Sequence, residues 1–226
     1  MATSSVDAAQ EQAWNEQQLA APVSQPAARL WVYPQPAVVL GRSQQALRSS
    51  LDTGRHRFVA RSAGGGAVLV GPWMLGVSVV LPLQHHLLQE ASIADSYRWL
   101  GAVFVAALAQ HGVAAAAVPH ERTRKAPADL AWACFAGMSA WEVAVDDRKL
   151  VGFAQRRARH GVLLVAGALL SHVPWETLCD AMQRPAMQAL ALAATTVDAS
   201  QLIGRPLPAQ DLASSVADRL TEALAG

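Results

Sequence analysis

The chain has 226 residues, of which 52% are hydrophobic and 15% are charged, so it can build a large core and has little tendency to disorder. Its 18 Lys and Arg residues nearly balance 17 Asp and Glu residues, for a formal net charge of +1. No overall field attracts a polyanion, and we expect neither a nucleic acid nor a membrane surface as a partner.

The length and the cysteine content are typical of one catalytic domain in a reducing compartment. A composite α/β domain reaches this size without splitting, so we expect a single domain over residues 1–226. Cys134 and Cys179 form no CxxC pair, which argues against a disulfide framework and a zinc knuckle. Residues Met1 to Trp14 contain no basic leader and no apolar run, unlike a signal peptide, and we predict a cytoplasmic protein.

The first half of the chain predicts one helix and then a series of strands. The helix spans Asp7 to Ala20, which holds good helix formers and is stopped by Pro22. Short β-prone segments follow, separated by prolines and glycines. They span Leu30 to Tyr33, Ala37 to Leu40, Phe58 to Arg61, Ala67 to Val70 and Val77 to Leu81.

A long stretch from Ser62 to Gln89 has no Asp, Glu, Lys or Arg, so hydropathy alone would flag a membrane span. Gly71, Pro72 and Pro82 interrupt this stretch, however, and its valine-rich parts have the length of strands. We therefore interpret it as buried strands joined by a turn.

The second half predicts a long helix, an irregular segment, a three-stranded meander and further helices. Ser92 caps the long helix and Gly112 ends it. The irregular segment, Val118 to Ala131, is either an active-site loop or a solvated connection. The meander strands span Trp141 to Val145, Lys149 to Arg156 and Val162 to Leu170, and the last helices include Trp175 to Met182 and Leu212 to Leu224.

Two motifs carry the candidate chemistry. The first is a glycine loop between strands, Arg61-Ser62-Ala63-Gly64-Gly65-Gly66-Ala67-Val68. Residues without Cβ let backbone amides approach a phosphate or carboxyl oxygen closely, although a flexible hairpin has the same composition. The second motif, Lys149-Leu150-Val151-Gly152-Phe153-Ala154-Gln155, adds a cation at the start of a strand. Its Gly152 and Ala154 share one face, which leaves room for a ligand beside the backbone.

Together the two motifs resemble the lipoate–protein ligase A and octanoyltransferase family, whose signature is an Arg-x-x-Gly-Gly-Gly-Ala-Val loop followed by a Lys-x-x-Gly-x-Ala strand. The likeness extends to Gly41-Arg42-Ser43-Gln44, which is similar to the family's Gly-Arg-x-Gln turn. It also includes Cys134-Phe135, as in the cysteine-dependent octanoyltransferase branch. The resemblance covers most of the chain.

The resemblance implies an α+β fold with a mixed, largely antiparallel sheet flanked by helices, as in biotin and lipoate ligases. It implies an enzyme that transfers an octanoyl or lipoyl group to a lysine of a carrier, either a lipoyl domain or the glycine-cleavage H protein. Lys149 corresponds to the family's active-site lysine, whose charge would stabilise negative charge in the transition state. The substrate-binding residues that it implies are Arg42, Arg61, Gly64, Gly65, Gly66, Ala67, Val68, Gly152 and Ala154.

Cys134 has two open interpretations. In the transferase branch a thiolate takes the acyl group from an acyl-carrier thioester and passes it to the target amine, and a nearby Lys149 would favour that thiolate. Cysteine is also among the residues most often buried, so the alternative is that Cys134 only packs beside Phe135. Cys179 has no chemical neighbour in the pattern and is expected to pack.

Departures from the family pattern leave three functions open. Where the ligase pattern has a His-Asp pair this chain has Val70 and Gly71, and where it has His-Gly this chain has Ala166 and Gly167. We expect no C-terminal accessory domain, which would favour a transferase or a split ligase, whereas three glycines in the loop favour the ligase branch. The candidates are therefore a thioester-dependent transferase, an ATP-dependent lipoate–protein ligase, and a noncatalytic protein that binds a lipoyl domain or a small acid.

These candidates differ in what they require. A transferase needs no cofactor and takes its acyl group from acyl carrier protein, whereas a ligase needs ATP and Mg²⁺. The histidines are scattered without metal-ligand spacing, so we assign no metal to protein side chains.

Overall fold

The computed structural model describes residues 3–89 and 92–225; the remaining residues, which include both ends of the domain predicted over 1–226, lie outside the described residues. Within these ranges the largest unit is a seven-stranded sheet in the order β1-β2-β6-β10-β9-β8-β7. Only the β1–β2 pair is parallel, and the other neighbours are antiparallel. Its strands are β1 (Thr3–Ser5), β2 (Ala27–Val32), β6 (Met74–Leu81), β7 (Ala116–Ala117), β8 (Val143–Val145), β9 (Arg148–Arg157) and β10 (Val162–Leu169).

A smaller sheet holds the strands on either side of the glycine loop. Its order is β4-β3-β5, with β3 (Ala37–Leu40) parallel to β4 (Phe58–Ala60) and antiparallel to β5 (Val68–Val70). The strands expected to form one sheet are thus divided between two. The mixed, largely antiparallel character that the sequence predicted is confirmed.

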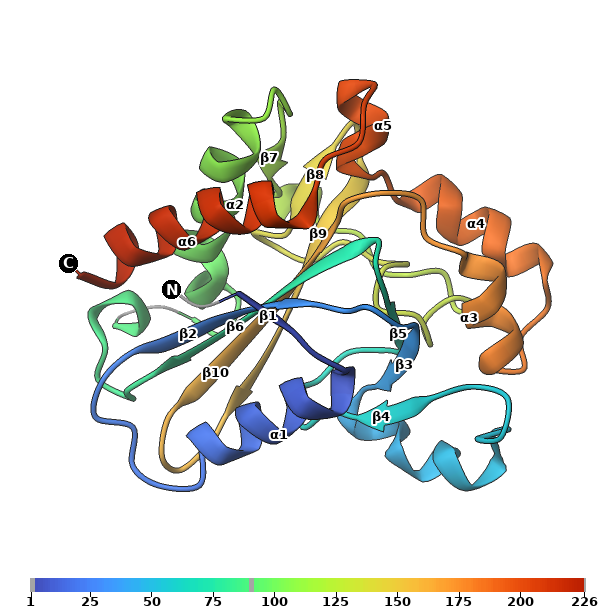
Figure 1. Ribbon diagram of the computed structural model, residues 1–226, viewed down its shortest axis with the longest axis horizontal. Helices are drawn as coiled ribbons and strands as arrows, with labels where there is room; N and C mark the ends of the chain where they lie inside the picture. The colour runs from blue at the N-terminus through green and yellow to red at the C-terminus, as the bar shows by residue number, and fades with distance from the viewer. Residues whose placement is uncertain (1–2, 90–91, 226) are drawn as a thin grey trace.

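Helices cover both faces of the large sheet (Figure 1). On one face α2 and α6 pack against each other, and on the other α1 lies beside the small sheet, while α3 and α4 lie next to β5 and β9. The helices are α1 (Ala8–Gln18), α2 (Arg98–Ala109), α3 (Trp175–Ala181), α4 (Met187–Thr195), α5 (Ala199–Ile203) and α6 (Ala209–Ala225). Short 3₁₀ turns are η1 (Arg42–Ser50), η2 (His86–Leu88), η3 (Asp95–Tyr97) and η4 (His120–Arg122).

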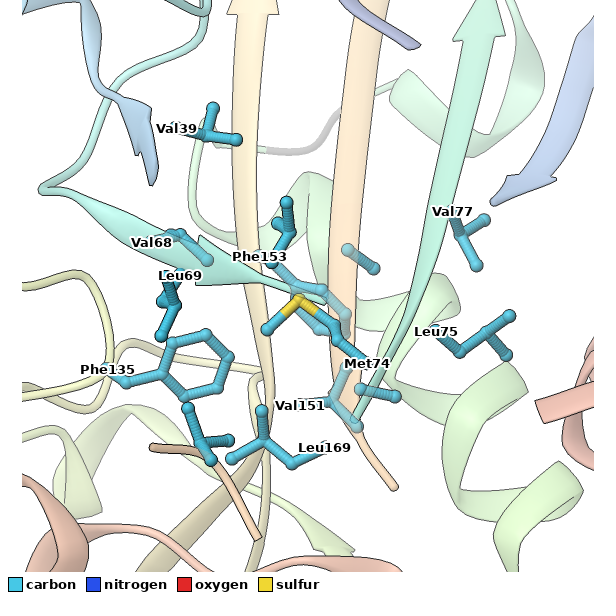
Figure 2. Packing of buried hydrophobic residues seen from close by; sticks show 14 of the residues in the cluster. Val39, Val68, Leu69, Met74, Leu75, Val77, Phe135, Val151, Phe153 and Leu169 are labelled. Atoms are coloured by element: carbon cyan, nitrogen blue, oxygen red, sulfur yellow. The ribbon is translucent and has the colours of Figure 1, made fainter. Parts of the chain in front are cut away.

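The uncharged stretch from Ser62 to Gln89 folds as the buried strands β5 and β6, as predicted. Every residue of β6 is buried because both faces of this central strand are covered, and such strands are continuously apolar rather than alternating. Figure 2 shows Met74 of β6 close to Val68 of β5 and to Phe135, in the core between the two sheets. No helix within residues 3–89 and 92–225 is long and apolar enough to cross a bilayer.

Local sequence signals explain most element boundaries. Asp7 caps α1, since its side chain accepts a hydrogen bond from the Gln10 amide while the Gln10 side chain accepts one from the Asp7 amide. Asp146 and Asp147 take left-handed φ values of 49° and 62°, which form the tight turn of the β8–β9 hairpin. Several boundaries differ from the prediction. The helix expected after Ser92 begins with the 3₁₀ turn η3 before α2, and the strand expected over Trp141 to Val145 begins at Val143 because Trp141 lies in a turn with a left-handed φ.

Candidate active site

Cys134 is held beside the glycine loop by the backbone of its own segment. The Ala67 amide donates to the Trp132 carbonyl over 2.8 Å, and the Cys134 amide donates to the Ala67 carbonyl over 3.0 Å. Gln44 of the predicted Gly-Arg-x-Gln turn also donates to the Trp132 carbonyl, over 2.9 Å. The Cys134 side chain is half-buried, so its thiol is positioned yet reachable.

Close backbone packing explains why two positions of this region are occupied by glycine. A Cβ on Gly41 would lie 1.8 Å from the Gly65 carbonyl oxygen, and a Cβ on Gly66 would lie 2.4 Å from the Trp132 carbonyl oxygen. Gly64 is different, since it is exposed and no atom lies within 4 Å of its Cβ position. In the part of the chain that the structure describes, the amides of Gly65 and Gly66 donate no hydrogen bond, so they remain as donors for a substrate oxygen.

Arg61 is buried at the base of the loop and holds it closed. Its guanidinium donates to the carbonyl oxygens of Gly64 and Gly66, over 2.9 Å each. The same Nη2 lies 3.7 Å from Cys134 Sγ. A positive charge beside the sulfur stabilises negative charge on it, so Arg61 organises the loop and faces the thiol at once.

Lys149 is buried in an ion pair with Glu142, a residue that the sequence analysis did not single out. Its Nζ lies 2.8 Å from Glu142 Oε2, and the two side chains are 2% and 3% exposed. Nζ also donates to the Cys134 carbonyl oxygen over 3.0 Å. The ammonium group therefore contacts the backbone of Cys134, and it is Arg61 that lies beside the sulfur.

The turn before β8 brings Glu142 inward. Trp141 has a left-handed φ of 68°, and the Glu142 carboxylate accepts hydrogen bonds from the amides of Ser139 (2.7 Å) and Phe153 (3.1 Å). A buried ion pair needs such additional hydrogen bonds to offset the loss of water. The only signal in the sequence is an acidic residue within an otherwise apolar segment.

A narrow slot runs from Cys134 between the two sheets. It contains about 530 Å³ of empty space, a figure that includes open solvent at its mouth. Little of that space admits the centre of a water molecule, so the slot is narrow and its walls lie close together. Its apolar walls are Val39, Val68, Val70, Met74, Phe135, Gly152, Phe153, Ala154, Val165, Ala166 and Gly167.

Two departures from the ligase pattern lie in these walls. Val70 stands where that pattern has the histidine of its His-Asp pair, and Ala166 stands where it has the histidine of its His-Gly pair; both line the slot, as does Gly167, which matches the pattern. The side chain of Met74 fills the space beside Gly167, since a Cβ there would lie 2.9 Å from the Met74 sulfur. The slot is therefore apolar where the ligase pattern is polar.

One end of the slot carries a buried polar pair on α1 and after β2. The Tyr33 hydroxyl donates to Glu11 Oε2 over 2.8 Å, and both residues line the slot. Burial raises the pKa of Glu11 to about 7, and the hydrogen bond from Tyr33 and the charge of Arg61 oppose that rise.

An open groove lies on the other side of Cys134. Its rim includes part of the irregular segment Val118 to Ala131, so that segment lines a site. Cys134 and Phe153 line both the slot and the groove, which places the thiol where the two meet. The polar and glycine residues of the groove are Gly65, Gly66, His120, Thr123, Arg124, Lys125, Cys134, Gly137, Ser139, Glu142 and Lys149.

The structure brings most of the predicted site residues together around Cys134. Gly65, Gly66 and Lys149 line the groove, and Arg61, Val68, Gly152 and Ala154 line the slot. Ala67 is buried behind them and joins the segment of Cys134 by two backbone hydrogen bonds. Arg42 and Gly64 are exposed and line neither space. Cys179 is buried in α3, as expected for a packing residue.

No group of three His, Cys, Asp or Glu side chains within 3–89 and 92–225 converges as a metal site would require.

The fold is that of a lipoate ligase catalytic domain. A putative lipoate protein ligase from T. acidophilum with bound lipoic acid matches with a TM-score of 0.71 and 15% identity, over 98% of this chain and 84% of that one. The bi-partite lipoate protein ligase from Thermoplasma acidophilum, described with its E2 lipoyl domain, matches with a TM-score of 0.68 and 17% identity, over 99% and 82%.

Sequence comparison identifies the family. Residues 7–221 match the lipoyl protein ligase A/B catalytic domain, and the chain belongs to this family. The octanoyltransferase LipM of Kyrpidia tusciae is 30% identical over 210 residues, which are 88% of this chain and 76% of that relative. The family and the fold predicted from the two motifs are confirmed.

Proposed function

We propose that this protein is a thioester-dependent octanoyltransferase that moves an octanoyl group to a lysine of a lipoyl carrier domain, with Cys134 as the covalent relay. The position of the thiol, between an apolar slot and an open groove and beside Arg61, is the observation that supports this most strongly. A relay needs a place for the acyl chain and access for two successive partners. Similarity to an octanoyltransferase and to a ligase described with its lipoyl domain supports the same reaction and partner.

The reaction has two steps and needs no cofactor. First, the Cys134 thiolate attacks the carbonyl carbon of an octanoyl thioester on acyl carrier protein; a new C–S bond forms, the donor's C–S bond breaks, and the donor thiolate takes up a proton. Second, the ε-amine of the carrier lysine attacks the acyl carbonyl, a C–N bond forms, and the bond to Cys134 sulfur breaks.

Each group around Cys134 has a distinct role in this scheme. The slot holds the hydrocarbon chain, and Arg61 stabilises the thiolate. Lys149 holds the backbone of Cys134 at the wall of the groove, and the amides of Gly65 and Gly66 are donors for the oxyanion of the tetrahedral intermediate. The apolar Val70 and Ala166 lack the polar groups of the ligase pattern, which favours the transferase over ATP-dependent ligation.

The test is the mass of an unmodified lipoyl domain after incubation with the protein and one of two donors. We expect a mass gain with octanoyl-acyl carrier protein that Cys134→Ala abolishes and the matched control Cys179→Ala retains. Modification by lipoate with ATP and Mg²⁺ that survives Cys134→Ala would instead establish a ligase. A failure of both donors would favour the noncatalytic binding protein.

A further inference from the structure

We propose that His120 is the general base of the second step, taking a proton from the carrier lysine, and that Asp95 positions it. This inference rests on the proposed function, because it concerns the step in which the acyl group leaves Cys134.

The chemistry of the second step calls for a base in the groove. A lysine side chain is protonated near neutral pH, and its ammonium form cannot attack a carbonyl carbon. Two groove residues, Arg124 and Lys125, are themselves cationic. Glu142 is occupied by Lys149 and by the amides of Ser139 and Phe153.

Lys149 is bound by the Glu142 carboxylate and by the Cys134 carbonyl oxygen. His120 is then the base that remains among the residues lining the groove. Imidazole is the side chain that takes up and releases protons near neutral pH. The His120 side chain is 53% exposed, so a partner that enters the groove can reach it.

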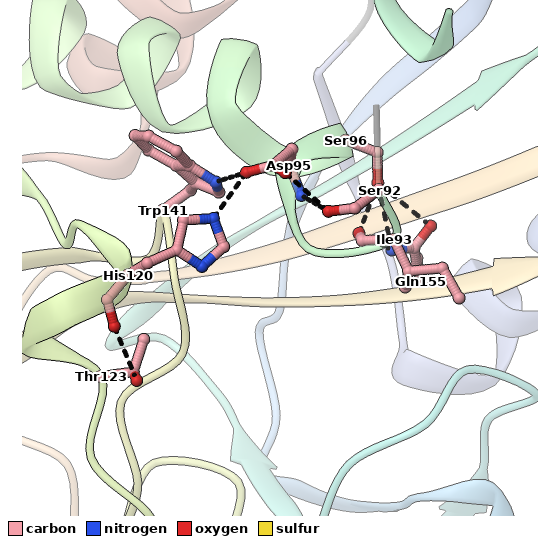
Figure 3. A network of polar contacts seen from close by, with 8 residues as sticks. All are labelled: Ser92, Ile93, Asp95, Ser96, His120, Thr123, Trp141 and Gln155. Atoms are coloured by element: carbon pink, nitrogen blue, oxygen red, sulfur yellow. Dashed lines mark hydrogen bonds and ion pairs between the residues drawn. The ribbon is translucent and has the colours of Figure 1, made fainter. Parts of the chain in front are cut away.

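A carboxylate fixes the orientation of this imidazole (Figure 3). His120 Nε2 lies 2.6 Å from Asp95 Oδ1, which favours the tautomer with its proton on Nε2. Within residues 3–89 and 92–225 the other ring nitrogen, Nδ1, has no hydrogen-bond partner. A histidine held at one nitrogen by a carboxylate and free at the other is the arrangement by which enzymes orient a general base.

Asp95 is itself fixed by two further donors. The Ser92 hydroxyl donates to its Oδ2 over 2.7 Å, and the Trp141 indole donates to its Oδ1 over 2.9 Å. Hydrogen bonds from Ser92, His120 and Trp141 lower the pKa of Asp95 to about 2, so it stays a carboxylate through the neutral range. The Trp141 ring also lies edge-on to His120, with 5.6 Å between ring centroids.

One strained turn connects this pair with the rest of the site. Trp141 has a φ of 68°, which is uncommon for a bulky residue and is typical of functional positions. Trp141 reaches Asp95, while its neighbour Glu142 reaches Lys149. The same turn therefore sets both a His–Asp pair and a Lys–Glu pair, and His120, Glu142 and Lys149 all line one groove.

The charged groups on the elements next to His120 define its surroundings. Arg98 of α2 lies behind Trp141, 5.1 Å from the ring centroid, and Arg122 is paired with Asp147 of the hairpin. The remaining ones are Asp95 of η3, Glu121 of η4, and Arg124 and Lys125 of the following segment. Asp95 alone among these makes a hydrogen bond with the ring in the part of the chain that the structure describes.

The carrier ammonium gives one proton to His120 Nδ1, and the neutral amine forms the C–N bond to the acyl carbon. The C–S bond to Cys134 breaks, and the departing thiolate takes the second amine proton. The His120 imidazolium then releases its proton to solvent.

The experiment separates the two steps. Wild type and His120→Gln are loaded with octanoyl on Cys134 from an octanoyl thioester, then mixed either with lipoyl domain or with hydroxylamine, an amine that is uncharged at neutral pH. We expect loading and hydroxylamine release at the wild-type rate, but transfer to lysine slower by about 10²-fold or more. Asp95→Asn should slow transfer less and change its pH profile, and the exposed His172→Gln serves as matched control.

Three outcomes would overturn the inference. If His120→Gln transfers the acyl group to lysine at the wild-type rate, His120 is not the general base. Equal slowing with lysine and with hydroxylamine assigns His120 a structural role instead. A wild-type protein that forms no acyl-Cys134 refutes the proposed function, and this inference with it, and the loading step alone reveals that case.

Discussion

The positive charge of Lys149 is matched inside the protein by one carboxylate, that of Glu142. Neither side chain reaches solvent, and the pair is completed by the Cys134 carbonyl and two backbone amides. At the residue scale, the lysine that the sequence singled out is therefore half of a unit that also holds the proposed relay cysteine.

Removing one partner of this pair should cost more than removing both. Lys149→Met leaves the Glu142 charge buried and unpaired, so we expect the free energy of unfolding to fall by about 3–5 kcal/mol. The double variant Lys149→Met with Glu142→Gln should recover much of that loss while remaining inactive. Urea unfolding of wild type, the two single variants and the double variant measures these free energies of unfolding. If the losses of the two single variants simply add up in the double variant, the two residues are not a coupled pair.

Glu11 predicts a pH dependence of stability. The pKa of Glu11 in the folded protein, about 7, lies above its ordinary value of 4.5. The stability that Glu11 contributes to the fold is therefore fully present below pH 4.5 and is lost as the pH rises through 7. The shift in pKa corresponds to a loss of roughly 3 kcal/mol in the free energy of unfolding at alkaline pH. Glu11→Gln keeps the acceptor for Tyr33 without the charge, so its stability advantage over wild type should grow between these pH values. Thermal unfolding of both proteins across this range checks it, and a constant difference would refute it.

At the element scale, the site depends on how closely the loop approaches the segment that carries Cys134. The loop and the segment share the Ala67 hydrogen bonds, and glycine at two positions removes the Cβ atoms that would hold the chains apart. The Gly-Arg-x-Gln turn takes part through the packing of Gly41 on Gly65 and the hydrogen bond of Gln44. Three short segments thus position one thiol.

Two alanine substitutions in the loop should have opposite outcomes. Gly66→Ala places a Cβ 2.4 Å from the Trp132 carbonyl oxygen, so the Cys134 segment must shift. We expect a loss of about 1–3 kcal/mol in stability and a large loss of acyl-Cys134 formation. Gly64→Ala, whose Cβ position is open, is the matched control and should behave as wild type. Unfolding curves and mass spectrometry of the acyl-enzyme provide both readouts, and equal effects of the two variants would count against close packing.

At the scale of the whole molecule, the slot lies between the two sheets. Val39 and Val68 reach it from the small sheet, and Ala154 and Val165 from the large one. An acyl chain in the slot contacts both sheets and buries apolar surface that the free protein leaves uncovered.

Acylation should therefore stabilise the fold. One kcal/mol shifts Tm by roughly 2–4 °C for a chain of this size, so we expect octanoyl-Cys134 protein to melt several degrees above the free protein. A butanoyl group should give a smaller increase because it buries fewer methylenes. Differential scanning fluorimetry checks this, hydroxylamine removal of the acyl group should reverse it, and equal shifts for both chain lengths would argue against a slot for the chain.

The sequence by itself determined the family, the fold class, most strands and the two motifs. These are local properties: apolar patterns of strand length, Asp7 as a cap, the paired aspartates of a hairpin, and glycines at close approaches all act over a few residues. The same local information predicted Lys149 and Cys134 as candidates, but it left open whether Cys134 only packs.

Only the tertiary structure decided which groups meet. The division of the strands into two sheets creates the slot, and no local pattern records that division. Asp95 and His120 are 25 residues apart in the chain, and Arg61 and Cys134 are 73 apart, so their contacts depend on the path of the whole backbone. Glu142 was missed for the same reason, since a lone acid in a sequence does not show that it is buried, and its role follows from the strand that places Lys149 against it.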